Sequence, residues 1–138
     1  MEKQYTISEV AKMFHMQTST LRYYEEIGIL TNIQRTTSGK RIYLQKHVNR
    51  LKTICCFKHT GMSIANLQKF FSYEENETGN IKEIIQLLLT QKEQVKKQLE
   101  ELQNDYAHVG RKLAYYSDMQ KALNEQKPLP NWQDYKQK

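Results

Sequence analysis

The sequence predicts a mostly α-helical protein, in which a small N-terminal head is followed by one long helix. Three observations lead to this prediction. Apolar residues at helical spacing recur in short runs through residues 6–73, a β-like stretch interrupts them near residue 40, and an unbroken heptad pattern follows residue 80. Hydrophobic residues make up 38% of the 138-residue chain and charged residues 26%, which suits a small domain with an exposed helical extension.

The excess positive charge lies entirely in the first half of the chain. Residues 1–73 contain 11 Lys/Arg and 4 Asp/Glu, a net charge of +7, whereas residues 74–138 contain 10 and 11, a net charge of −1. This asymmetry predicts a polyanionic partner for the first half, and nucleic acid is favoured over a membrane surface because no basic helix has a strongly apolar opposite face. No apolar run approaches the roughly 18 residues that span a bilayer, and no signal-peptide pattern occurs, so we expect a cytoplasmic protein.

The sequence offers no pattern for catalysis or metal binding. Its two cysteines, Cys55 and Cys56, are adjacent, and neighbours on a helix point about 100° apart, so they form neither an ordinary disulfide nor a metal chelate by themselves. No Ser/His/acid set, paired carboxylates in a pocket-forming region, phosphate-binding Gly-rich loop or His/Cys cluster occurs. We therefore expect no enzyme, no metal and no cofactor.

Residues 6–28 have the pattern of two short helices joined by a tight turn. Thr6 and Glu9 have the spacing of a capping box at the start of the first helix, and Gly28 suits the end of the second. The core stripe of the second helix consists of Leu21, Tyr24 and Ile27. The polar face that remains free for an outside partner carries Thr18, Ser19, Arg22 and Tyr23. This pattern predicts a helix-turn-helix.

Residues 33–43 break the helical periodicity and predict a β-hairpin. Two short β-like stretches flank a turn at Ser38 and Gly39. Three cations lie on or beside this turn: Arg35, Lys40 and Arg41. A cationic hairpin beside a helix-turn-helix favours a wing that grips phosphate over a merely solvated hairpin. The predicted head is therefore a winged helix-turn-helix domain.

Two further helices complete the predicted head. One covers residues 45–59 and is closed by Gly61, and the next begins at Ser63. Their core faces carry Val48, Leu51, Ile54 and Cys55 in the first, and Ile64, Leu67, Phe70 and Phe71 in the second. The polar, Gly-containing stretch 74–79 marks a boundary, so residues 1–73 are expected to form one domain.

Residues 80–120 are predicted to be a coiled-coil dimerisation helix. Apolar residues recur from Ile81 to Tyr116 at spacings of four and three, with Lys92 as the one charged member. The residues assigned to dimerisation are Ile85, Leu88, Val95, Leu99, Leu102, Tyr106, Val109 and Leu113. Because nothing else in the chain is large enough to cover this stripe, we expect a homodimer, and antiparallel pairing would set the two basic heads apart. For the tail, residues 121–138, packing on the partner subunit and disorder both stay open.

The motifs ISEVAKMF, TLRYYEEIGIL, SGKRIY and GMSIANL, in this order and spacing, resemble the MerR family of bacterial transcription regulators. The resemblance is close over residues 5–72, whereas in the coiled coil only the heptad pattern is shared. TLRYYEEIGIL is a highly specific motif. It implies a dimer of winged heads on a long antiparallel helix that binds double-stranded DNA at a palindromic operator. The operator lies in a promoter whose spacer is too long, and the dimer bends and untwists the DNA so that RNA polymerase can use it.

The resemblance also implies which residues contact DNA. Thr18, Ser19, Arg22 and Tyr23 match the major-groove helix and its phosphate contacts, and Arg35, Lys40 and Arg41 match the wing. Lys40 departs from the family pattern, which commonly has an aromatic residue after the wing glycine.

The run RLKTICCFKHTGMSI, with the later KLAYY, is most similar to the short NmlR- and AdhR-like branch, which responds to aldehydes and other thiol-reactive electrophiles. That branch has a single cysteine five residues before the glycine of the third-to-fourth helix turn, here Cys56. Helix geometry predicts a buried Cys55 and an accessible Cys56, with Lys52, Lys58 and His59 nearby in the sequence to favour thiolate. The alternatives are a regulator with a non-covalent effector or none, and an architectural, excisionase-like DNA-binding protein.

Overall fold

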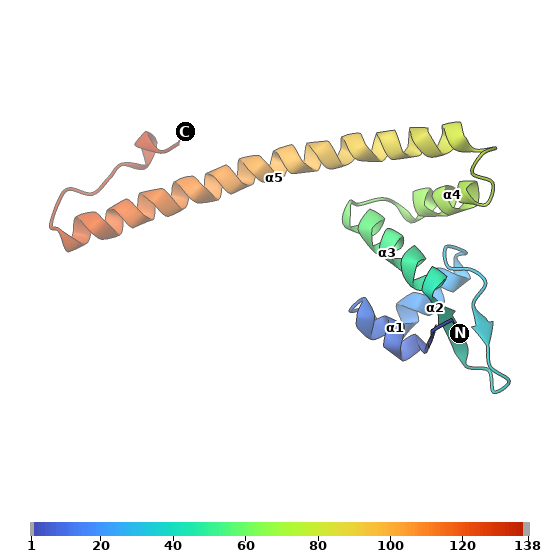
Figure 1. Cartoon of the computed structure of the whole chain (residues 1–138). Helices are drawn as coiled ribbons and strands as arrows, with labels where there is room; N and C mark the ends of the chain where they lie inside the picture. Colours follow the sequence, from blue (N-terminus) through green and yellow to red (C-terminus); the bar gives the residue numbers. More distant parts are fainter. Residues whose placement is uncertain (1, 137–138) are drawn as a thin grey trace. The chain divides into compact units, whose positions relative to one another are not determined.

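The computed structural model describes residues 2–136 and confirms a mostly helical fold with a small antiparallel sheet (Figure 1). Its elements, in chain order, are β1 (Gln4–Tyr5), α1 (Ile7–Met13), α2 (Thr18–Glu26), β2 (Gln34–Arg35), β3 (Arg41–Leu44), α3 (Gln45–His59), α4 (Ile64–Glu74), α5 (Ile81–Asn124) and the 3-10 helix η1 (Trp132–Asp134). The chain forms two compact units, one up to Gln91 and one from Lys92 onward.

The helix-turn-helix forms where its capping residues predict it. The Thr6 hydroxyl accepts a hydrogen bond from the Glu9 amide at 3.1 Å, and the Glu9 carboxylate accepts one from the Thr6 amide at 2.9 Å, so the capping box is confirmed. Gln17 is the N-cap of α2, without a side-chain hydrogen bond. After α2, Gly28 has φ +82°, which a glycine adopts without strain, and the chain leaves the helix there for the segment that leads to β2.

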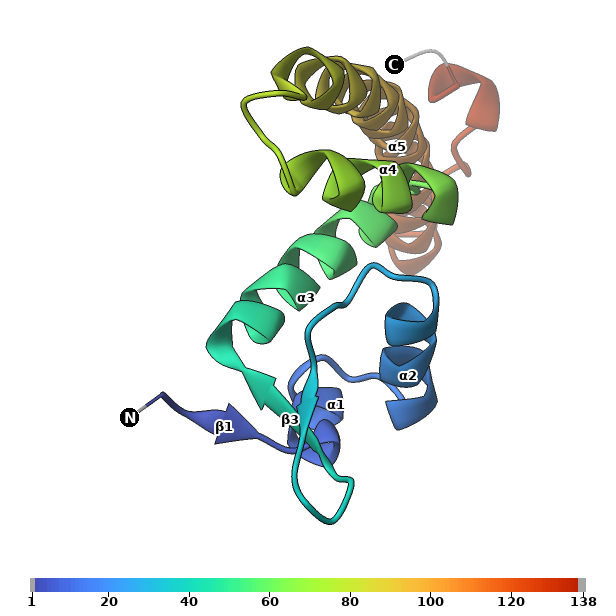
Figure 2. The same cartoon turned by 90° about the vertical axis from the view of Figure 1, so that its right-hand side faces the viewer.

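The predicted hairpin is part of a three-stranded antiparallel sheet with the order β1-β3-β2 (Figure 2). Arg35 pairs with Arg41 across the hairpin, and Gly39 in the turn has φ +88°. The strand that sequence analysis missed is β1, in which Tyr5 pairs with Tyr43. It is two residues long, too short for an alternating pattern to show. The added strand ties the N-terminus to the base of the wing.

The core of the head is one apolar cluster built from all four of its helices and from β3. Leu21 and Tyr24 of α2 are buried in it, and Ile27 packs against it, as the stripe predicts. The other buried members are Val10, Ala11, Ile29, Leu30, Tyr43, Leu51, Ile54, Met62, Leu67, Phe70 and Phe71.

One core assignment needs correction. Cys55 is only half-buried, whereas Phe57 packs against the core and meets the edge of Phe70 at a ring-centroid distance of 5.0 Å. The stripe of α3 continues from Leu51 and Ile54 at spacings of three, which brings Phe57 inward in place of Cys55.

The long helix α5 has 44 residues, which corresponds to a length of about 66 Å. It begins at Ile81 and continues to Asn124, past the expected end at residue 120. Its first turns belong to the compact head, because Ile84 and Leu87 pack against the core cluster. The head unit therefore extends beyond residue 73, into the segment that the heptad pattern assigns to dimerisation.

The tail folds back on the end of its own helix, an arrangement that the sequence did not predict. The Trp132 ring lies 5.5 Å from that of Tyr115 and 6.0 Å from that of His108, measured between centroids. The Lys112 ammonium lies 3.8 Å from the centre of the Trp132 ring, and the Tyr135 hydroxyl donates a hydrogen bond to Asp118. The tail is thus held by aromatic contacts and one cation–π pair within the second unit.

Candidate nucleic-acid interface

Two neighbouring tyrosines of α2 differ in exposure, one in the core and one on the outward face. Tyr24 is 2% exposed and lies in the core, whereas Tyr23 is 45% exposed. Ser19 and Arg22 are exposed beside it, and Thr18 is half-exposed. The helix therefore offers a polar and aromatic face to the outside while its apolar stripe fixes its position.

Lys58 supports α2 from behind. Its ammonium donates a hydrogen bond to the Tyr24 hydroxyl at 3.1 Å and lies 5.5 Å from the centre of the Tyr24 ring. This contact joins α2 to α3 and satisfies the one polar atom that Tyr24 brings to the core. The orientation of α2 thus depends on α3 as well as on the turn after α1.

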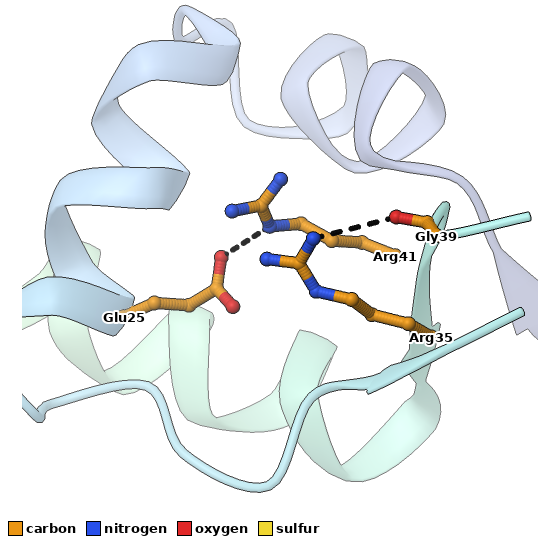
Figure 3. A network of polar contacts seen from close by, with 4 residues as sticks. All are labelled: Glu25, Arg35, Gly39 and Arg41. Carbon is orange, nitrogen blue, oxygen red and sulfur yellow. Dashed lines mark hydrogen bonds and ion pairs between the residues drawn. The ribbon is translucent and has the colours of Figure 1, made fainter.

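An ion pair brings the wing against the end of α2. The Arg41 Nε atom lies 2.6 Å from the Glu25 carboxylate, and each side chain is 20% exposed (Figure 3). Arg35 reaches from the other strand of the hairpin, and its guanidinium donates to the Gly39 carbonyl at 3.4 Å. Sequence reasoning missed Glu25, because nothing local to TLRYYEEIGIL indicates which of its two glutamates meets the wing.

The three predicted wing cations have different surroundings. Arg35 and Lys40 are exposed, whereas Arg41 is half-buried and its Nε atom is engaged by Glu25. Lys40 and Arg41, together with Gly39, line a cleft of about 420 Å³ that also borders the first residues of α1. Of the three, Arg35 and Lys40 offer their charge most freely to an outside anion.

Two buried polar side chains, Tyr43 of β3 and His47 at the start of α3, lie in the head. Burial, and secondarily the nearby charge of Glu25, raises the pKa of Tyr43 to about 12, so this hydroxyl stays neutral. The His47 Nδ1 atom accepts a hydrogen bond from the Leu44 amide at 2.9 Å, which caps the start of α3. Burial lowers the pKa of His47, which favours the neutral imidazole that this cap requires.

The two cysteines of α3 lie in different environments. Cys56 is exposed, and Cys55 is half-buried, where burial raises the pKa of its thiol. Thr60 lies one turn after Cys56. The Gln91 side-chain amide donates to the Thr60 hydroxyl at 2.8 Å and to the Thr60 carbonyl at 3.2 Å. Cys56 therefore precedes the point where α3 is tied to α5 within the head.

The apolar stripe of α5 is open over nearly its whole length in the single chain. Tyr106 is 82% exposed, and Val95 alone among the assigned residues is half-buried. The other exposed members are Ile85, Leu88, Leu99, Leu102, Val109 and Leu113. Such a row of large exposed apolar side chains is typical of a surface that binds another protein surface.

Within residues 2–136, no group of three or more His, Cys, Asp or Glu side chains is placed to hold a metal ion. The same part of the chain has no helix that is both long and apolar enough to cross a membrane.

Comparison with known proteins identifies the family. The model of the MerR HTH family of regulatory proteins matches residues 5–74. An uncharacterized HTH-type transcriptional regulator of Haemophilus influenzae is 32% identical over 125 residues, 91% of this chain and 92% of that protein. AdhR, an HTH-type transcriptional regulator of Bacillus subtilis, is 36% identical over 64 residues, 46% of each chain.

A solved structure extends the similarity to the whole fold. HiNmlR, a MerR family regulator lacking the sensor domain and crystallised with promoter DNA, superimposes with a TM-score of 0.80 at 28% identity, over 99% of this chain and 98% of that one. This agreement covers the winged head and the long helix together, and the matched relatives are transcriptional regulators rather than enzymes. The chain is a member of the MerR family of helix-turn-helix transcriptional regulators.

Proposed function

We propose that the protein is a dimeric, sequence-specific DNA-binding regulator that acts at a promoter by distorting the DNA. The observation that carries this proposal is the Glu25–Arg41 ion pair, which sets the cationic wing beside the exposed face of α2. A basic head that presents one helix and one hairpin together suits a major groove and its flanking phosphates. The HiNmlR structure, solved with promoter DNA, supports this assignment.

In this proposal α2 is the recognition helix, which enters the major groove. Arg22 and Tyr23 are its long exposed side chains, and Thr18 and Ser19 lie at its N-terminal end, where backbone amides also face a phosphate. Arg35 and Lys40 contact phosphates from the wing. Arg41 contributes through the guanidinium N–H groups that Glu25 does not engage.

The salt dependence of binding tests the interface. If each dimer neutralises about eight phosphates, the logarithm of the binding constant falls with the logarithm of salt concentration at a slope near −7. Fluorescence anisotropy with a labelled operator, selected from fragments of the source genome, measures this slope. Arg22→Ala should weaken binding, and Lys97→Ala, an exposed cation of α5, should not. A flat salt profile contradicts the assignment of the wing.

The second half of the proposal is self-association through the apolar stripe of α5. Its exposed leucines, valines and tyrosines repeat with a heptad period, which is the pattern that pairs two helices. Antiparallel pairing would place one basic head at each end, so that two recognition helices reach successive major grooves of a palindrome. Light scattering at micromolar concentration should give the mass of a dimer. Replacing Leu99 and Leu102 by Asp should give a monomer with weaker DNA binding.

Activation by DNA distortion follows from the resemblance to the family and requires the dimer. Two heads at a fixed separation can hold an operator bent and untwisted, which realigns promoter elements for RNA polymerase. Fluorescence energy transfer between the ends of a labelled promoter fragment should show shortening when the dimer binds. In transcription with purified RNA polymerase, lengthening the promoter spacer by half a helical turn should abolish the effect.

Exposed Cys56 is proposed as a sensor of thiol-reactive electrophiles. The thiolate would add to the electrophilic carbon of an aldehyde or quinone, forming a carbon–sulfur bond while an oxygen of the electrophile takes up the electron pair and a proton. The adduct would lie one turn before Thr60, which accepts both hydrogen bonds from Gln91. It would therefore change the packing at the Gln91–Thr60 junction between α3 and α5, which in this proposal sets the separation of the two heads.

Matched serine variants test the sensor. Mass spectrometry of electrophile-treated protein should find the adduct on Cys56 before Cys55, whose thiol is half-buried. Cys56→Ser should bind the operator normally and lose the transcriptional response, whereas Cys55→Ser should keep it. A double serine variant that responds like the wild type would favour the second candidate, a regulator with a non-covalent effector.

A further inference from the structure

A groove lies between α4 and the first turns of α5, entirely within the head. Its volume is about 510 Å³, within the range of roughly 300–1,000 Å³ that small-molecule sites occupy. Lys69 and Tyr73 line it from α4, and Lys82, Leu87 and Thr90 line it from α5. None of these residues takes part in the proposed DNA interface or in the apolar stripe.

The groove is positively charged, and the ammonium groups of its two lysines are free to bind a ligand. Among residues 2–136, none forms a hydrogen bond or ion pair with the ammonium group of Lys69 or of Lys82, and both side chains are exposed at the groove. Glu83 supplies the one carboxylate of the lining, so the groove has a net charge of +1. Two unpaired ammonium groups on facing helices favour a ligand that carries negative charge.

The groove also has an apolar wall. Leu87 and Tyr73 are both half-buried, and Leu87 packs against the core cluster of the head. A leucine that packs on the core and an aromatic ring in the same lining offer apolar surface to a ligand. The preferred ligand is therefore an anion with an apolar body rather than a bare inorganic ion.

Pairing of two copies through the apolar stripe would leave the groove open. In the heptad that places Ile85 and Leu88 at the paired a and d positions, Glu83 and Thr90 fall at f, the position farthest from the partner helix. Leu87 falls at c, also outside the paired seam, and Lys82 falls at e, beside the seam, where its long side chain still reaches the groove. The groove is thus lined by no a or d residue of the stripe assigned to a second copy.

The geometry points to a binding site for a small organic anion in the α4–α5 groove, with its carboxylate between Lys69 and Lys82 and its apolar body against Leu87 and Tyr73. Binding would lock α4 to the first turns of α5. This assignment needs neither DNA nor a second copy, because all of its residues belong to the compact unit that ends at Gln91.

Calorimetric titration of the full chain with 2-naphthoate tests the site, with the uncharged 2-naphthamide as the matched ligand. Naphthoate should bind more tightly than the amide, and its affinity should fall as salt rises, because the attraction is between exposed charges. An absence of binding up to about 10 mM naphthoate, or equal affinity for acid and amide, would overturn the assignment.

Three variants within the groove and one outside it locate the site. Lys69→Gln and Lys82→Gln should each weaken naphthoate binding about two- to fivefold, the effect of one solvent-exposed ion pair. Thr90→Trp should block the groove without changing its charge, and Lys97→Gln, an exposed lysine outside it, should bind like the wild type. If Lys97→Gln weakens binding as much as Lys69→Gln, the probe is held only by overall charge and the assignment is wrong.

A further variant separates this assignment from the proposed function. Leu99→Asp with Leu102→Asp, which should abolish the dimer, should leave naphthoate binding unchanged. Loss of naphthoate binding in this variant would place the site in the paired stripe and overturn the groove assignment. Unchanged binding supports the groove, whatever the variant does to DNA binding.

Discussion

Replacing Glu25 by Gln tests how the wing is held against α2. The carboxylate lies 2.6 Å from the Arg41 Nε atom, and each side chain is 20% exposed. A hydrogen bond to a charged group contributes about 1.5–3 kcal/mol and an exposed ion pair about 0.2–1 kcal/mol. Because Gln keeps an acceptor oxygen and loses only the charge, we expect the free energy of unfolding to fall by about 1 kcal/mol. For a domain of this size, thermal denaturation should then occur about 4–8 °C lower.

The same change should strengthen non-specific DNA binding. It removes one negative charge from each head and frees the Arg41 guanidinium for phosphate. If each of the two heads gains one phosphate contact, the salt slope steepens by about 2, and non-specific affinity rises at low salt. Specific binding should gain less, because the wing is no longer fixed beside α2. The ratio of operator to non-specific affinity, measured by fluorescence anisotropy, should therefore fall.

Glu26→Gln is the matched control, since Glu26 is the exposed neighbour on α2 and has no ion-pair partner among residues 2–136. It makes the same change in net charge, so it should raise non-specific affinity slightly and leave both the melting temperature and the affinity ratio unchanged. The reasoning is refuted if Glu25→Gln behaves like Glu26→Gln in both measurements, because the ion pair would then contribute neither stability nor position.

Three other predictions concern the rest of the chain. Burial lowers the pKa of His47 in the folded state, so the neutral imidazole contributes stability above the unfolded pKa of about 6.5, and this stability is lost as the pH falls below that value. The melting temperature of His47→Asn should therefore depend less on pH between about 7 and 5 than that of the wild type. Trp132 is the one tryptophan of the sequence and reports on the tail: Lys112→Gln should raise the quenching of its fluorescence by the neutral quencher acrylamide, and unchanged quenching would contradict the folded-back tail. Gln91→Ala loses its two hydrogen bonds to the turn after α3 and should destabilise the head by about 1–2 kcal/mol in urea unfolding, whereas the exposed Gln94→Ala should not.

The sequence by itself determined the helices of the head and the division between inward and outward faces. Capping and periodicity depend on residues within a few positions of each other, so the Thr6–Glu9 box and the inward Tyr24 beside the outward Tyr23 follow from the order of residues alone. The heptad pattern of α5 is likewise local, and it predicted a continuous helix over residues 80–120. Gly39 marked the turn of the wing for the same reason.

Only the tertiary structure decided the contacts between segments that lie far apart in the sequence. The Glu25–Arg41 ion pair, which spans 16 positions, depends on how the hairpin docks on α2, and no local pattern distinguishes Glu25 from Glu26. The pairing of β1 with β3 and the return of Trp132 to α5 also depend on surfaces that exist only after the helices have packed. Such contacts form because folding brings distant groups within a few ångströms, and a spacing along the chain carries no record of that distance.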